Sequence, residues 1–180
     1  MRKKYNYRIL ITWQNIIKDI AKYKKVLQNK KIKFDIIKAK QNIKEKTLLK
    51  IVHLYDGILC GDDEITKKVI DKAKKLKVIS KWGAGMDSID VAYAKKNKIK
   101  VFNSPDAFPE SVAVYALGLM IILSRKIVDA NQSIRDGLWK KFEGIQLANK
   151  NLGLIGYGRI GKRIAKLAKH FNLNIFINDI

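Results

Sequence analysis

The chain has 180 residues, of which 47% are hydrophobic and 30% charged, and its formal net charge is +22. The apolar content is enough for a core, and the single cysteine, Cys60, excludes an intrachain disulfide framework and a thiolate metal cluster. The longest apolar run, residues 112–123, is too short to span a bilayer, so we expect a cytoplasmic protein with no membrane contact. We also expect no metal site.

A net charge this high usually suggests a nucleic-acid partner. Here the lysines are scattered over several predicted helices and loops, without interleaved aromatic residues, and only six of the 38 basic residues are arginine. We therefore interpret the charge as solvated helix faces. A basic nucleic-acid-binding fragment remains as a third hypothesis.

The first hundred residues alternate between predicted strands and helices. Apolar runs predict strands over 7–12, 32–37, 57–60, 78–80 and 100–102, and helical periodicity predicts helices over 16–28, 45–53, 65–76 and 91–96. We expect Asp62, Asp63 and Glu64 to be N-terminal residues of the helix over 65–76, and Cys60 to be buried. This alternation predicts a small α/β domain with a parallel sheet.

Two glycines directly follow the predicted strand over 78–80. Gly83 and Gly85 flank Ala84 at the carboxyl edge of the sheet, where ligands of open α/β sheets bind. Backbone N–H groups in such a loop can point outward at an anion. We expect an anionic ligand here.

Pro109 is a natural first residue for the apolar segment ESVAVYALGLMIILSRK that follows it. This segment has no polar face, so a helix here must be buried on every side, between domains or against a second copy of the chain. We therefore expect a homodimer through the helix over 111–125. A polar helix is predicted over 129–137.

The last 29 residues predict a strand, a glycine turn, a helix and a second strand that ends at Asp179. The helix would bury Ile160, Ile164, Leu167, Ala168 and Phe171 and expose Lys162, Arg163, Lys166 and Lys169. The run over 173–177 is typical of a strand buried on both faces.

Each glycine of the turn suits dinucleotide binding. Gly156 permits a tight turn, Gly158 lets the backbone approach a pyrophosphate, and Gly161 lets the helix pack close to the strand. Arg159 adds positive charge at the helix N-terminus, and Asp179 follows Gly156 by 23 positions, near the spacing of a ribose-binding acid. This acid favours NAD over NADP. The alternative is a glycine turn in another kind of α/β domain.

Three stretches, Gly83–Asp90 (GAGMDSID), Val101–Pro105 with the later SVAVYALGLM, and Gly153–Asp179, together resemble the D-isomer-specific 2-hydroxyacid dehydrogenases. The branch they resemble most is that of the phosphoglycerate dehydrogenases. The resemblance implies an NAD-dependent oxidoreductase acting on a D-2-hydroxy acid. It also implies a flavodoxin-like substrate domain over 1–103, the start of a Rossmann NAD-binding domain over 104–180, and an active site in the cleft between them.

The resemblance also implies roles for single residues. Arg159 and Ile160 would contact the pyrophosphate through their backbone, and Asp179 the adenosine ribose. Ala84 and Gly85 would hold the substrate carboxylate, with Ala84 also near the cofactor. Val112 would lie near the nicotinamide ring.

The sequence departs from the family in two respects. Val114 stands where the family usually has a glutamate, and the family's catalytic arginine, glutamate and histidine all lie after the ribose-binding acid. We therefore expect an inactive N-terminal portion with no catalytic residue, in which His53 and His170 are surface or packing residues. A non-catalytic NAD-sensing interaction protein is the alternative, because transcriptional corepressors resemble the same family. A 3-phosphoglycerate-like substrate is compatible with the sequence, which does not select one 2-hydroxy acid.

Overall fold

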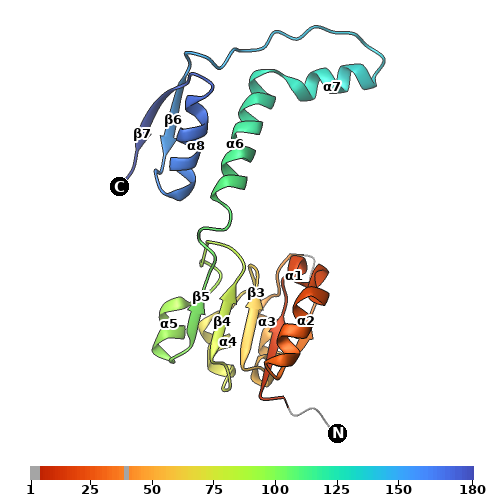
Figure 1. Cartoon of the computed structure of the whole chain (residues 1–180), viewed down its shortest axis with the longest axis vertical. Coiled ribbons are helices and arrows are strands. Elements are labelled where there is room, and N and C mark those ends of the chain that lie inside the picture. Colours follow the sequence, from red (N-terminus) through yellow and green to blue (C-terminus); the bar gives the residue numbers. More distant parts are fainter. Residues whose placement is uncertain (1–4, 39–40) are drawn as a thin grey trace. The chain divides into compact units, whose positions relative to one another are not determined.

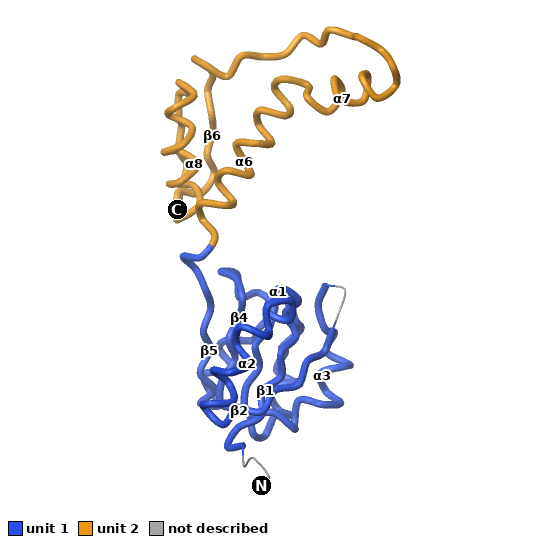
Figure 2. The backbone as a smooth tube through the Cα atoms, turned by 45° about the vertical axis from the view of Figure 1, so that its right-hand side comes forward, with its two compact units in different colours: residues 1–107 blue, residues 108–180 orange. Residues whose placement is uncertain are grey.

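The computed structural model describes residues 5–38 and 41–180 and divides the chain into two compact units, residues 1–107 and 108–180 (Figure 2). We predicted a boundary at 103/104, between a substrate domain and an NAD-binding domain. This division by function stays a prediction. The units are described separately below.

The first unit is built on a five-stranded parallel sheet in the order β2-β1-β3-β4-β5 (Figure 1). Its strands are β1 (Tyr7–Ile11), β2 (Ile32–Ile36), β3 (Gly57–Cys60), β4 (Val78–Lys81) and β5 (Lys100–Phe102). This order is the flavodoxin-like arrangement, so the parallel-sheet α/β fold expected from the alternating pattern is confirmed.

Helices connect these strands. They are α1 (Gln14–Lys18), α2 (Ile20–Asn29), α3 (Glu45–Ile51), the 3-10 turn η1 (Val52–Leu54), α4 (Lys67–Lys72) and α5 (Val91–Lys96). Right-handed crossovers place α1 and α2 on one face of the sheet and α3, α4 and α5 on the other, because the chain reverses its direction across the sheet after β2. The main core lies under the second group, where Leu10, Ile58 and Ile79 of the sheet pack with Leu48 and Val69.

The prediction that acids open the helix after β3 is wrong. Helix α4 begins at Lys67, and the hydroxyl of Thr66 caps it by accepting a hydrogen bond from the Val69 N–H at 3.5 Å. Asp62, Asp63 and Glu64 lie in the preceding loop, where tertiary partners far along the chain engage each of them. Sequence spacing could not reveal those partners.

The second unit contains α6 (Pro109–Ser124), α7 (Ile127–Arg135), β6 (Asn151–Ile155), α8 (Arg159–Lys169) and β7 (Asn174–Asn178). Strands β6 and β7 pair in parallel, and α6 packs against α8. Buried Leu117, Ala168 and Leu173 form the centre of this core. Arg163, expected on the exposed side of α8, instead donates to Glu110 of α6, with Nη2 2.7 Å from Oε1.

Several apolar side chains of the second unit are more exposed than predicted. Ile160 is 40% exposed and Phe171 38%, while Phe176 and Ile177 of β7 are 61% and 47% exposed. Helix α8 covers one face of the two-stranded sheet, and no other described element covers the second face. The strand is therefore not buried on both sides.

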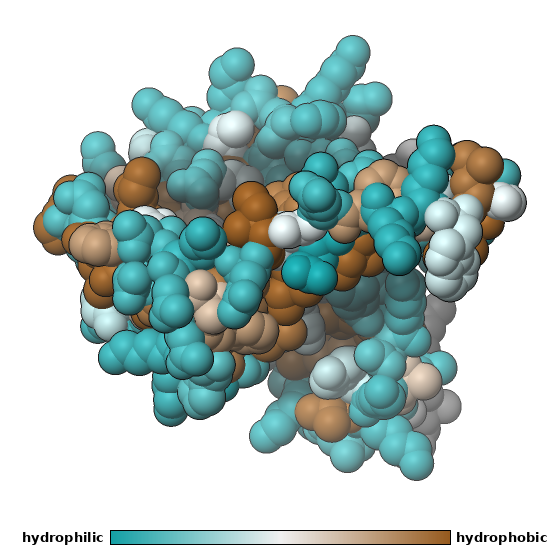
Figure 3. Space-filling model, turned by 90° about the horizontal axis from the view of Figure 1, so that it is seen from above, coloured by the Kyte–Doolittle hydropathy of each residue, from teal (hydrophilic) through white to brown (hydrophobic). Residues whose placement is uncertain are grey.

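Helix α6 is likewise not buried on every side. Ala113 and Leu117 are buried, but Tyr115 is 69% exposed and Leu123 76%. Viewed from above, hydrophobic side chains lie at the surface among hydrophilic ones (Figure 3). Among the described residues no single helix is long and apolar enough to cross a membrane, although α6 and α7 reach that length and composition together across a 62° bend.

Candidate functional site

The glycine turn of the second unit lies at the carboxyl end of β6. Gly156 has a φ of +94°, a left-handed conformation that glycine adopts without steric cost. Its N–H donates to the carbonyl oxygen of Asn178 at 2.8 Å, which holds the turn against the end of β7. Gly158 is the residue before α8, so the helix N-terminus opens at this turn.

Gly161 packs directly against the turn. A Cβ built on Gly161 would lie 2.1 Å from the carbonyl oxygen of Gly156, which is far inside van der Waals contact. At Gly158 a built Cβ meets no atom within 4 Å, so the space above it is open. A tight turn, a close helix and an open approach are the three properties that a pyrophosphate site requires of these glycines.

Asp179 lies beside this turn. Ile155 and Asn178 are partners in the β6–β7 register, so Gly156 and Asp179 each follow directly after paired strand ends. Arg159 and Ile160 are the first two residues of α8. The structure thus brings all six predicted residues of this region to one edge of the sheet. Val112 lies in the first turn of α6 and is 40% exposed, and its predicted position near a nicotinamide ring stays a prediction.

The second candidate region is the loop after β4 in the first unit. Ala84 and Gly85 are exposed, and Gly83 has a φ of +139°. The loop is held from β5: the side-chain amide of Asn103 donates to the Ala84 carbonyl oxygen at 2.7 Å, and the Ser104 N–H donates to the Gly83 carbonyl oxygen at 2.9 Å. Within residues 5–38 and 41–180, no acceptor is found for the N–H groups of Ala84 and Gly85. Both can donate to a ligand.

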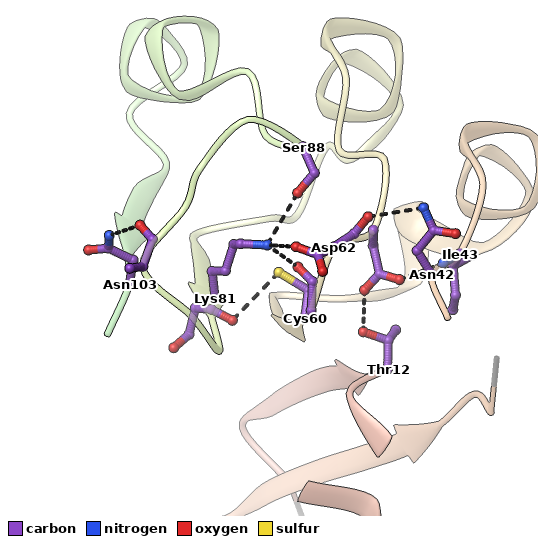
Figure 4. Close-up of polar contacts among 12 residues, drawn as sticks. Thr12, Asn42, Ile43, Cys60, Asp62, Lys81, Ser88 and Asn103 are labelled. Carbon is purple, nitrogen blue, oxygen red and sulfur yellow. Dashed lines mark hydrogen bonds and ion pairs between the residues drawn. The ribbon is translucent and has the colours of Figure 1, made fainter. Parts of the chain in front are cut away.

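The buried side chain of Lys81 connects this loop to the loop that follows β3. Lys81 was not identified as a functional residue from the sequence. Its side chain is 4% exposed, and its ammonium donates to the Gly61 carbonyl oxygen at 2.8 Å, pairs with Asp62, and lies 3.5 Å from the Ser88 hydroxyl (Figure 4). A buried ammonium needs such partners. The sequence did carry a signal for a buried lysine, because Lys81 directly continues the apolar strand predicted over 78–80.

Asp63 holds the neighbouring loop from within the protein. It is 3% exposed, and its carboxylate accepts hydrogen bonds from the Ile43 N–H at 2.6 Å and from the Thr12 hydroxyl. These contacts join the segments that follow β1, β2 and β3. Hydrogen bonds therefore fix the loops at the carboxyl edge of the sheet, where the loop after β4 also lies.

Neither histidine lies at these edges. His53 is exposed in η1, just before β3 begins, and His170 is exposed at the C-terminal end of α8, just before β7 begins. Both positions belong to the amino edges of their sheets, opposite the glycine turn and the loop over 83–85. Among the described residues no group of three or more His, Cys, Asp or Glu side chains could hold a metal ion.

Known proteins share this arrangement. The family model described as the D-isomer specific 2-hydroxyacid dehydrogenase catalytic domain matches residues 14–170. The D-3-phosphoglycerate dehydrogenase of Methanocaldococcus jannaschii is 44% identical over 138 residues, which cover 76% of this chain and 26% of that protein. The hydroxypyruvate reductase of Thermotoga maritima is 39% identical over 142 residues, covering 77% of this chain and 46% of that one.

Among solved structures, the NAD⁺-bound 3-phosphoglycerate dehydrogenase of Entamoeba histolytica superimposes with a TM-score of 0.75 at 26% identity. The match covers 96% of this chain and 54% of that one. The chain thus spans between about a quarter and about half of the length of these relatives.

Proposed function

The chain belongs to the D-isomer specific 2-hydroxyacid dehydrogenases, and we propose that its 180 residues bind NAD at the glycine turn and a 2-hydroxy or 2-oxo acid at residues 83–85. The observation that carries the proposal is the packing of the turn. Gly161 is pressed against Gly156, the space above Gly158 is open, and Asp179 stands at the adjacent strand end. A carboxylate there accepts hydrogen bonds from a ribose and repels a 2′-phosphate, so NAD is favoured over NADP.

The loop after β4 would hold the acid. The N–H groups of Ala84 and Gly85 suit a carboxylate, because two outward backbone donors bind an anion without a charged side chain. NAD supplies the hydride acceptor when it is bound. Moving the hydroxyl proton needs a base within hydrogen-bond reach. The family resemblance implies a histidine in this role, and both histidines of this chain lie at the opposite edges of their sheets. We therefore propose binding without turnover.

Calorimetric titration of the 180-residue chain tests the cofactor site. We expect NAD to bind more tightly than NADP and Asp179→Asn to lose most of this preference, while Asp129→Asn, an exposed acid of α7, leaves it unchanged. Equal binding of the two cofactors by the unchanged chain would contradict the site. Incubation with NAD and D-3-phosphoglycerate should give no NADH absorbance. Steady turnover would contradict the proposal that the chain binds without turnover.

Helix α6 supports a homodimer as a further part of this proposal. Val114, Tyr115 and Leu123 are each more than half exposed, and a second copy could cover them. Sedimentation equilibrium that shows a monomer at every concentration would exclude it. The exposed helix is equally compatible with a non-catalytic NAD-sensing interaction protein, and an NAD-dependent change in assembly without turnover would favour that alternative. The cytoplasmic location stays a prediction.

A further inference from the structure

A second concave site lies in the first unit, at the same carboxyl edge of the sheet as the loop over 83–85. It is a pocket of about 550 Å³ between the segments that follow β1, β2 and β3. The sheet order β2-β1-β3-β4-β5 changes direction between β1 and β3, and ligands of doubly wound sheets bind outside the carboxyl ends of the strands at that point. The volume falls within the range of roughly 300–1,000 Å³ of ligand sites and exceeds what a three-carbon acid fills.

The pocket wall is rich in neutral hydrogen-bonding groups. Four amide side chains line it together with Trp13, namely those of Gln14, Asn15, Gln41 and Asn42. Side-chain amides both donate and accept, so they match hydroxyl groups, which do the same. The indole N–H of Trp13 is buried, and no acceptor for it is found in the described part of the chain. This N–H is itself covered, so Trp13 lines the pocket with other atoms of its side chain.

The charges at the pocket disfavour a phosphate. Lys44 pairs with Glu64, with its Nζ 2.7 Å from Oε1, and this hydrogen bond lowers the pKa of Glu64, which keeps the carboxylate charged. Asp62 pairs with the buried Lys81, yet its own side chain is 75% exposed at the pocket. Both cations are thus neutralised by carboxylates, so the pocket offers no unpaired cation to a phosphate dianion.

The pocket and the carboxylate loop lie at the ends of neighbouring strands. Strands β3 and β4 are neighbours, about 4.8 Å apart, so Asp62 after β3 and the loop after β4 lie side by side. Lys81 joins them, because its ammonium contacts both Asp62 and Ser88, three residues beyond Gly85 (Figure 4). A molecule whose carboxylate rests on Ala84 and Gly85 could extend across Asp62 into the pocket.

We propose that this pocket receives the tail of the substrate and selects an uncharged, polyhydroxylated tail, as in sugar-derived 2-hydroxy acids, over a phosphorylated one. The inference rests on the proposed function, because it takes residues 84–85 as the carboxylate anchor. It narrows the substrate class and disfavours a 3-phosphoglycerate-like acid.

Nuclear magnetic resonance of the ¹⁵N-labelled 180-residue chain tests the tail and the anchor separately. The probes are D-gluconate, D-3-phosphoglycerate and D-lactate, which are all D-2-hydroxy acids with different tails. The backbone N–H of Gly85 reports the carboxylate, whereas the indole N–H of Trp13 and the side-chain amide of Asn42 report the pocket. We expect D-gluconate to shift all three signals and to bind about tenfold more tightly than D-lactate, because two or three added hydrogen bonds supply that factor.

D-Lactate and D-3-phosphoglycerate should shift the Gly85 signal and leave the pocket signals in place. If D-gluconate also shifts only Gly85, or if D-3-phosphoglycerate binds the pocket more tightly than D-gluconate, the tail assignment is overturned while the proposed function stands. If no acid shifts Gly85, the carboxylate anchor of the proposed function fails, and the tail assignment fails with it.

A variant pair tests the electrostatic part of the argument. Asp62→Asn keeps an oxygen for the Lys81 ammonium but removes the negative charge, so it should tighten D-3-phosphoglycerate binding severalfold and bring its shifts into the pocket. Asp71→Asn, another exposed acid of the same unit, should leave all three affinities unchanged. Unaltered phosphoglycerate binding in Asp62→Asn would refute the role given to this carboxylate.

Discussion

Replacing Gly161 with alanine is expected to destabilise the second unit, although the same change usually strengthens a helix. The new Cβ would lie 2.1 Å from the Gly156 carbonyl oxygen and 3.1 Å from its carbonyl carbon. Both atoms are backbone, so α8 must move by about 1 Å to reach an ordinary contact distance. Overpacking of this kind costs roughly 1–3 kcal/mol, and the better helix propensity of alanine returns about 1 kcal/mol. We expect a net loss of up to about 2 kcal/mol.

Gly118→Ala is the matched control. Gly118 lies inside α6, and a Cβ built there meets no atom within 4 Å, so alanine should stabilise the chain by about 1 kcal/mol through helix propensity alone. Urea unfolding with hydrogen exchange of the β6 and β7 amides localises each effect, which matters because two compact units can unfold separately. If Gly161→Ala were as stable as Gly118→Ala, the close-packing argument would be refuted.

Two further predictions concern titratable groups. Burial raises the pKa of the Cys60 thiol to about 12, so the folded chain should resist a thiol reagent at pH 8 and react in denaturant, whereas rapid native labelling would show that β3 opens. The hydrogen bond from Arg163 lowers the pKa of Glu110. A lowered carboxyl pKa contributes stability that is present above the ordinary value of 4.5 and is lost as the pH falls through the folded value. Glu110→Gln should therefore make the free energy of unfolding of the second unit fall less steeply as the pH drops below 4.5. An unchanged pH dependence would contradict the pairing.

The sequence by itself determined the strands, most of the helices, the glycine turn and the acid after β7, although the single helix predicted over 16–28 is divided into α1 and α2. These features are local: an apolar run of four or five residues, the three spaced glycines, and Asp179 at a fixed distance each carry their own signal. The loop over 83–85 has a local signal too, because its two glycines directly follow the strand over 78–80, which places it at the carboxyl edge of the sheet. The bounds of α5, β3 and β5 agree with the predicted ranges.

Only the tertiary structure decided what the charged residues do and which apolar faces are covered. Asp63 is paired with Thr12 and Ile43, Lys81 with Gly61 and Asp62, and these partners come from strands and loops distant in sequence. The exposure of β7 and α6 likewise depends on which elements pack against them. Sequence periodicity shows that a face is apolar, but burial is a property of the neighbours that pack on it, and those neighbours are set by the fold.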